Sequence, residues 1–237
     1  MEVNIADPLG KACFDFFNGV ENCKIKVMSD LVDDDIIPVK YLFRTFDEMP
    51  KIEQLALSLC RGRVLDVGAG AGSHALCLQN KGFMIDAVDM SHGACNVMRL
   101  RGIKNVIHSD FFSYSDEKYD TILMLMNGIG FTGSTDRIPQ FLNHCKQLLN
   151  KGGQVLLDSS DIAYLFNDVD TENITETLTH YYGEISYQMN YKEYQSERFK
   201  WLFIDFKLLN YLSQQHGWYC ELVMEGNHYE YLARLTI

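Results

Sequence analysis

The sequence is short of positive charge, which limits what the chain can bind. Its 237 residues include 21 Lys and Arg against 32 Asp and Glu, for a net charge of −11, and no cluster of five or more basic residues occurs. Because phosphate neutralisation dominates binding to DNA and RNA, we expect no nucleic-acid partner. A cationic ligand is compatible with this charge.

Long apolar runs and a basic leader are also absent. No apolar run approaches the roughly 20 residues that a membrane-spanning helix needs. The first residues include Glu2 and Asp7 instead of basic residues before an apolar block, so we expect no signal peptide. The seven cysteines include no C-x-x-C pair, which favours reduced, core-filling thiols. We therefore expect a cytoplasmic protein without a membrane span.

The length and the 47% hydrophobic fraction are those of a globular α/β chain with a sizeable core. We expect an N-terminal extension over residues 1–60 and a main domain over 61–237. Within the extension, the pattern predicts a helix over 8–17, a short strand at 25–27, a solvated loop over 31–36 and a helix from 51 to about 60.

The main domain is organised around one glycine-rich stretch. A short apolar strand over 64–67 is followed by Gly68, Gly70 and Gly72, and a helical pattern starts at Ser73. Strand, glycine turn and helix together are typical of nucleotide binding, since glycines let a ligand approach the backbone and the helix offers unpaired N–H groups. An ordinary tight turn is the alternative.

The glycine spacing separates two ligand classes in part. In the dinucleotide pattern G-x-G-x-x-G counted from Gly68, the third glycine would fall at Ser73. Counted from Gly70 it falls at Ala75, which the looser form allows. With Asp66 the stretch reads D-x-G-x-G-x-G.

Further acids follow the next predicted strands. Asp89 ends a strand about 20 residues beyond the first glycine, where a carboxylate can bind both ribose hydroxyls. It could instead join the helix cap that Ser91 forms. Asp110 and Phe111 follow a third strand, and Asn127 follows a fourth over 119–126. Because ligands in doubly wound sheets bind beyond the carboxyl ends of the strands, Asn127 should lie near the ligand, although it is also a common turn former.

Later residues predict the rest of the sheet. A helix over 136–150 has Asp136 as its expected cap, and a fifth strand covers 154–158. The loop 158–161 has no nearby His, so we expect no metal. A helix over 205–216 precedes a closing hairpin, with strands at 218–224 and 228–237.

An aromatic-rich insert covers residues 162–204. Its alternation predicts a β-hairpin with strands at 182–191 and 198–204. Its tyrosines and tryptophan could pack the core, form a substrate wall or form a dimer surface, and the sequence leaves these open.

Asp66 to Gly72, the acid at 89 and the closing hairpin together resemble the class I S-adenosylmethionine-dependent methyltransferases, and in particular bacterial members without an assigned substrate. The resemblance covers residues 60–160 and 205–237. It implies a doubly wound α/β fold with a seven-stranded sheet of order 3-2-1-4-5-7-6, whose last strand is antiparallel, with an N-terminal helical segment and an inserted β-hairpin.

The resemblance also implies a ligand and its contacts. S-adenosylmethionine would be the cofactor, and an N-terminal lid would cover the acceptor. The expected cofactor-binding residues are Gly68, Ala69, Gly70, Gly72, Asp89, Met90, Asp110, Phe111 and Asn127, and the lid or substrate candidates are Tyr41, Arg44, Tyr182 and Trp201. Arg44 could instead pair with an Asp, and no catalytic base is assigned.

We expect methyl transfer to a small-molecule acceptor by a monomer or homodimer. The N/D-P-P-Y/F motif of nucleic-acid and glutamine methyltransferases is absent. Two alternatives stay open at this stage: a nicotinamide-dependent oxidoreductase, and a protein that binds S-adenosylmethionine without catalysis.

Overall fold

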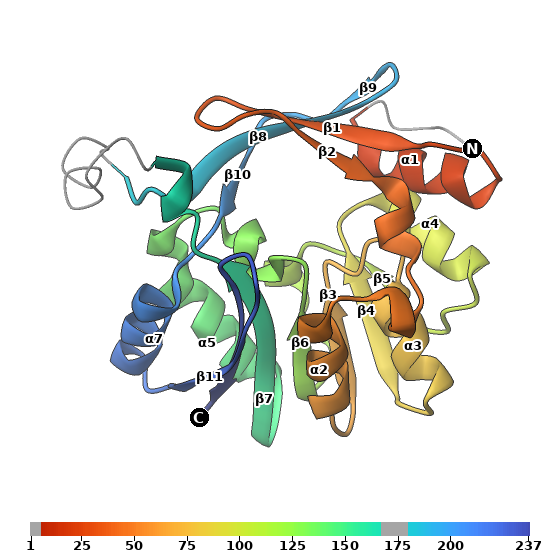
Figure 1. The fold of residues 1–237 in the computed structure, drawn as a ribbon. Helices are drawn as coiled ribbons and strands as arrows, with labels where there is room; N and C mark the ends of the chain where they lie inside the picture. Colours follow the sequence, from red (N-terminus) through yellow and green to blue (C-terminus); the bar gives the residue numbers. More distant parts are fainter. Residues whose placement is uncertain (1–5, 167–179) are drawn as a thin grey trace.

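The computed structural model describes residues 6–166 and 180–237. They contain two sheets, and the smaller sheet lies across the upper edge of the larger one (Figure 1). The lower, seven-stranded sheet has the order β11-β12-β7-β6-β3-β4-β5, with β12 antiparallel to both of its neighbours. In chain order its strands are β3 (Val64–Val67), β4 (Ile85–Asp89), β5 (Val106–His108), β6 (Tyr119–Met124), β7 (Leu149–Ser160), β11 (Tyr219–Glu225) and β12 (Glu230–Thr236). The predicted strand order, including the antiparallel last strand, is confirmed.

Helices cover both faces of this sheet because its strands are apolar on both sides. On one face, Leu123 and Leu156 pack with α2 (Lys51–Leu59), α3 (Ser73–Asn80) and α4 (His92–Leu100). On the other face, the residues directly before and after each of these leucines in the chain pack with α5 (Ile138–Leu148) and α7 (Phe206–Gln215). Short 3-10 helices connect the other elements: η3 (Phe111–Ser113), η4 (Gly128–Thr132), η5 (Thr135–Arg137) and η6 (Ala163–Phe166).

The upper sheet joins two segments that lie far apart in the sequence. It contains β1 (Lys24–Ser29), β2 (Asp35–Pro38), β8 (Glu184–Tyr191), β9 (Tyr194–Gln195) and β10 (Phe199–Leu202). β1 pairs with β8, so the predicted N-terminal strand and the predicted insert hairpin form one sheet. Below it lie α1 (Pro8–Phe17), η1 (Val39–Phe43) and η2 (Phe46–Glu48) (Figure 1). Residues 167–179 of the expected insert lie outside the described residues.

Three local predictions need correction. The α-helix near Asp136 begins only at Ile138, and Asp136 lies in η5, because Pro139 favours the first helical turn. Residues 158–160 belong to β7 and not to a loop, since they pair with residues 230–232 of β12. The loop predicted over 31–36 is shorter, because β2 already begins at Asp35.

The other predicted elements are confirmed with ends shifted by one or two residues, except that the strand predicted to start at 154 already begins at Leu149. The helix over 8–17 is α1, and Asp205 caps α7. Within the described residues, every cysteine is a free thiol, and no helix combines the length and apolarity needed to cross a membrane.

Candidate functional site

The turn between β3 and α3 has an exposed side and a packed side. Gly68, Gly70 and Gly72 all have positive φ, at 69°, 55° and 82°. A Cβ on Gly72 would lie 2.2 Å from a methyl carbon of Ile103, so this glycine is required by packing. A Cβ on Gly68 would meet nothing within 4 Å, so the backbone is open there to a ligand.

Asp89 closes this turn from the end of β4. The backbone N–H of Gly70 donates to its Oδ2 and that of Ser91 to its Oδ1, both at 2.8 Å. Burial raises the pKa of Asp89. Each carboxylate oxygen can accept a second hydrogen bond, so these contacts orient Asp89 and leave it able to accept ligand hydroxyls. The neighbouring Met90 is 74% exposed.

Asp66 lies below the same turn, and one of its carboxylate oxygens is a hydrogen-bond acceptor without a described donor. Burial raises its pKa to about 6, opposed by the nearby His74 and by a hydrogen bond from the backbone of Ala75. Its Oδ2 is buried and has no hydrogen-bond partner among the described residues. An unpaired buried carboxylate oxygen costs free energy unless a donor reaches it, and a ligand ammonium would be such a donor.

Arg44 belongs to a buried charge cluster. Its Nη2 donates to both carboxylate oxygens of Glu53, at 2.7 and 2.9 Å, and His74 Nε2 lies 2.8 Å from Glu53 Oε2. Burial alone would raise the pKa of Glu53, but its two partners hold it below the usual value. Burial alone would lower the pKa of His74, but Glu53 and Asp66 raise it. Arg44 therefore pairs with a buried Glu, and its Nε is left without a described partner.

A strained turn follows β6. Met126 and Asn127 have φ of 63° and 56°, which is unfavourable for side chains other than glycine. The Asp158 carboxylate holds the turn by accepting backbone N–H groups of Met126 at 3.1 Å, Asn127 at 2.7 Å and Gly128 at 3.4 Å. Burial raises the pKa of Asp158 to about 6, against the effect of these donors.

The side chain of Asn127 ties this turn to the upper sheet. Its Oδ1 accepts from Ser159 Oγ at 2.8 Å, and its Nδ2 donates to the carbonyl of Leu202 at 3.1 Å. Ser159 Oγ also accepts the N–H of Ile204 at 3.1 Å. Asn127 thus lies at the carboxyl edge of the sheet, as expected, and links that edge to β10.

The expected adenine contacts lie in different surroundings. Asp110 is exposed and accepts the N–H of Phe112 at 2.8 Å. Phe111 is 6% exposed, and its ring centroid lies 4.7 Å from that of His144 and 5.3 Å from that of Phe131. The Phe111 ring therefore packs in the hydrophobic core.

The four lid or substrate candidates fall into two places. Tyr41 is 46% exposed, with its ring centroid 5.5 Å from the guanidinium of Arg44. Tyr182 donates to Asp161 Oδ1 at 2.7 Å. Trp201 lies against η4, since a Cβ on Gly130 would be 2.1 Å from its Nε1. Tyr41 and Arg44 thus lie beside the glycine turn, whereas Tyr182 and Trp201 belong to the upper sheet region.

Two residues of the site stood outside the expected set of site residues, although the segment 158–161 was a possible substrate-orienting loop. Glu53 shows no local signal, because its partners are 9 and 21 residues away. Asp158 does show one, since an acid at the carboxyl end of a buried strand faces the ligand edge of such a sheet. No group of three or more His, Cys, Asp and Glu in the described ranges is arranged to hold a metal ion.

These residues fit a ligand that combines a nucleoside with a free amino acid group. The open backbone at Gly68 admits a ligand, Asp89 is oriented for hydroxyls, and the buried unpaired atoms of Asp66 and Arg44 are an acceptor and a donor. The last two match the ammonium and carboxylate of an amino acid.

Comparison with known proteins supports the same assignment. The model for the methyltransferase domain family matches residues 40–216. A crystal structure of an S-adenosylmethionine-dependent methyltransferase from Bacteroides fragilis, in complex with S-adenosyl-L-homocysteine, is 42% identical. That alignment covers 100% of this chain and 97% of the other, with a TM-score of 0.90.

More distant relatives agree in family or in fold. An uncharacterized methyltransferase of Staphylococcus carnosus (strain TM300) is 26% identical over 181 residues, covering 68% of this chain and 84% of that protein. The DhpI complex with SAH is 17% identical with a TM-score of 0.61, covering 98% and 96% of the two chains, and shows the shared fold. The oxidoreductase and the non-catalytic alternatives are not favoured. The chain belongs to the methyltransferase domain family and is a class I S-adenosylmethionine-dependent methyltransferase.

Proposed function

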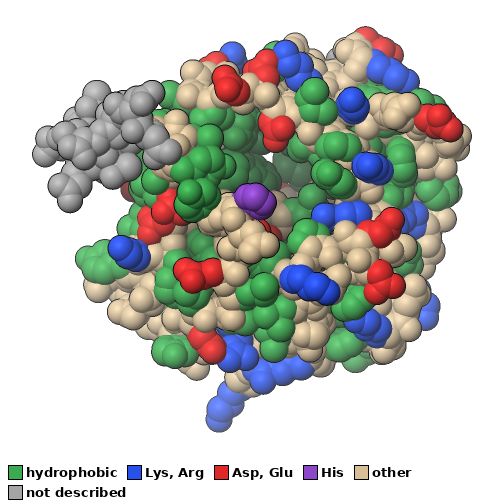
Figure 2. All heavy atoms as spheres, viewed as in Figure 1, with side chains coloured by type: hydrophobic (Ala, Val, Ile, Leu, Met, Phe, Trp, Pro, Cys, Tyr) green, Lys and Arg blue, Asp and Glu red, His purple; other side chains and the backbone are tan. Residues whose placement is uncertain are grey.

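We propose that the enzyme methylates a small molecule held between the two sheets. The observation that carries the proposal is the hollow in the middle of the molecule, below the upper sheet, with hydrophobic side chains along its rim (Figure 2). The strained turn at Asn127 borders the same region and is tied to β10 above it. A hollow closed by two sheets suits a small acceptor better than a polymer, and the net charge of −11 disfavours nucleic acid.

We assign the cofactor contacts as follows. Gly68 and its neighbours Ala69 and Gly70 would lie along the methionine part, Asp89 would accept the ribose hydroxyls, and Asp66 with Arg44 would meet the ammonium and carboxylate. Met90 and Asp110 would border the adenine. When bound, the cofactor supplies a sulfonium methyl, and the C–S electron pair goes to sulfur as the acceptor lone pair bonds to carbon.

The chain's own residues contribute mainly geometry. Holding two reactants in a near-attack arrangement can supply roughly 7–11 kcal/mol of the barrier. The Asp158 carboxylate keeps the turn at Met126–Asn127 in its strained conformation. We assign no general base, since an acceptor that is nucleophilic at neutral pH needs none. We also infer a cytoplasmic enzyme, as monomer or homodimer.

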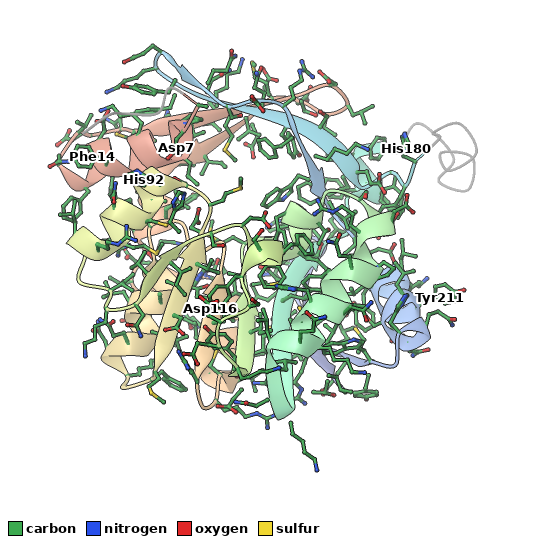
Figure 3. All side chains as sticks on the ribbon, turned by 180° about the vertical axis from the view of Figure 1, so that it is seen from behind. Asp7, Phe14, His92, Asp116, His180 and Tyr211 are labelled. Atoms are coloured by element: carbon green, nitrogen blue, oxygen red, sulfur yellow. The ribbon has the colours of Figure 1, made fainter. Side chains whose placement is uncertain are left out.

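The test is to follow methyl-labelled S-adenosylmethionine in a bacterial extract split into dialysable, protein and nucleic-acid fractions. We expect labelled small molecules other than S-adenosylmethionine in the dialysable fraction with the wild-type enzyme, above the background of the extract alone, and none above that background with Asp89→Asn. Asp116→Asn is the matched control, because Asp116 is an exposed acid in the loop before β6, away from the ligand edge (Figure 3). Label in the protein or nucleic-acid fraction would contradict the proposal.

A further inference from the structure

The two faces of the upper sheet differ in charge and aromatic content. In antiparallel pairs, residues opposite each other point to the same side. The register places Val27 opposite Met189, and Tyr187 opposite Phe199. Val27 and Met189 pack with α1, which lies between this sheet and α4, so the face that they share with Tyr187 and Phe199 is turned toward the lower sheet. We call it the inner face.

The inner face is aromatic where it is not covered by α1. The ring of Tyr187 lies 6.4 Å from that of Phe199 and 6.3 Å from that of Phe203. These three side chains are only half-buried. Tyr164, which stacks on Tyr229 at 4.6 Å, extends the aromatic surface from the end of β7. This is the wall against which a flat ring can stack.

Basic residues on the strands of the upper sheet lie on the opposite face. Lys26 lies opposite Asn190, and Lys200 lies opposite Ser186. Asn190 and Ser186 are each an odd number of positions from Tyr187, so both lysines point to the other face of the sheet. Among the described residues of β1, β2, β8, β9 and β10, no Lys or Arg points to the inner face. Arg44 and Arg101, nearer the glycine turn, are occupied by Glu53 and by the Ala71 carbonyl.

Among the described strand residues of the upper sheet, Asp35 is the carboxylate on the inner face, and it lies opposite Val27 at the end of β2. Burial raises the pKa of Tyr187 to about 12, and the charge of Asp35 adds to this, as expected for neighbours. Lys11 and Lys192, which lie near Tyr194 and Tyr191, both bind Asp15 of α1. An anionic acceptor would therefore be placed beside Asp35 with no cation from the described strands to pair with it, which is unfavourable. A protonated amine would be attracted both by Asp35 and by the aromatic rings.

We propose that the inner face binds the acceptor and that the acceptor is an arylalkylamine: a flat ring stacked against Tyr187 and Phe199, with its protonated amino group anchoring it at Asp35. This assignment rests on the proposed function and narrows it to a class of substrate. Trp201 then acts as a support that holds β10 on η4.

The test uses three probes of similar shape with the protein saturated with S-adenosyl-L-homocysteine: 2-phenylethylamine, 2-phenylethanol and 3-phenylpropanoate. Binding is followed by ligand-detected NMR titration. We expect the amine to bind best and the carboxylate worst. Tyr187→Ala should weaken the binding of the amine and of the alcohol by about tenfold, whereas Asp35→Asn should weaken the binding of the amine alone. Asp35→Lys should reverse the preference toward the carboxylate.

Ser186→Ala is the matched control, since Ser186 is the chain neighbour of Tyr187 on the opposite face. S-adenosyl-L-homocysteine affinity should stay unchanged in all four variants, which shows that they fold. Carboxylate binding as tight as that of the amine, no binding of any probe, or no effect of Tyr187→Ala would overturn the assignment. The proposed function fails separately, if label from the cofactor appears outside the dialysable fraction.

Discussion

Gly68 and Gly72 lie in one turn but are constrained from opposite sides. Gly72 is held by the side chains of Ile103 and Met98 beneath it, whereas the space above Gly68 is open. No described protein atom occupies the space that a side chain at Gly68 would fill, although this glycine lies at the candidate ligand site. We infer that this space is kept for the ligand. The same logic applies to Asp66, whose Oδ2 has no hydrogen-bond donor among the described residues.

The first prediction concerns this open position. Gly68→Ala should cost about 1 kcal/mol of folding stability, because the φ of Gly68 is 69°. It should also weaken the binding of S-adenosyl-L-homocysteine by roughly 10-fold to 100-fold, because the added methyl group takes up ligand space. Calorimetric titration measures the affinity and urea unfolding the stability. Gly82→Ala is the control: its φ is 90° and its added Cβ also meets nothing, so stability should fall similarly with the affinity unchanged. Equal affinity losses would refute the argument.

The second prediction concerns pH. Asp66 has its pKa raised from 3.8 to about 6, so the contribution of this group to stability is complete below pH 3.8 and is lost as the pH rises through 6. Asp66→Asn removes that loss. The variant should therefore gain on the wild type as the pH rises from 3.8 to 6, by about 1.4 kcal/mol for each unit of pKa shift, and then keep a constant advantage. Urea unfolding of both proteins across this range tests it, and a pH-independent difference would show that Asp66 is not shifted.

At the scale of elements, two helix starts share one carboxylate. Asp7 accepts the N–H of Gly10 in α1 at 2.8 Å, and also the N–H of Gly93 at 2.9 Å and the hydroxyl of Ser91 at the start of α4. Figure 3 shows Asp7 where α1 meets the end of α4 that carries His92. Since Ser91 also donates its N–H to Asp89, this joint connects the N-terminal helix to the candidate ribose site.

The third prediction follows from this double cap. Asp7→Ala should destabilise the protein by about 2 kcal/mol, because one helix cap contributes about 1 kcal/mol and Asp7 serves two helices. Asp110→Ala removes a single contact at the short η3 and should cost less. Chemical denaturation compares them, and equal costs would mean that the two caps do not add. We also expect weaker S-adenosyl-L-homocysteine binding in Asp7→Ala, through Ser91 and Asp89.

At the scale of the whole molecule, the upper sheet is built from distant parts of the chain. Strand β1 lies between β2 and β8, so residues near 26 and near 190 depend on each other for their backbone hydrogen bonds. The lower sheet has its own core clusters on its two faces, while Ile25 and Val27 belong to a third cluster with α1. The upper sheet should therefore open as a unit.

The fourth prediction tests this unit by hydrogen exchange. Ile25 is fully buried, so Ile25→Ala should cost about 2–5 kcal/mol in its cluster. Amides of β8, far away in sequence, should exchange faster, whereas those of β3 and β4 should keep their protection. Lys26→Ala, on the opposite face of the same strand, should change neither. Faster exchange confined to β1 would show that the sheet does not open together.

Much of the lower sheet could be predicted because its signals are local. The run from Val64 to Gly72 specifies strand, turn and helix through alternation and glycine positions, and Asp205 and Gly217 mark the ends of α7 by capping chemistry. Two of the three local predictions that needed correction concern this sheet. Asp136 looked like a helix cap, but the helix begins at Ile138 because Pro139 favours its first turn. Residues 158–161 looked like a loop, but 158–160 pair with β12.

The sequence by itself determined the strands and helices of the lower sheet and the acids at the ends of the strands, because apolar periodicity and glycine spacing act between near neighbours. The strand order and the family were implied by the resemblance of its motifs to the class I methyltransferases. Only the tertiary structure decided which residues meet. It paired Arg44 with Glu53 and His74, turned Phe111 into the core and joined β1 to β8 above the site. Contacts between distant segments depend on how elements pack in three dimensions, and no spacing in the chain encodes them directly.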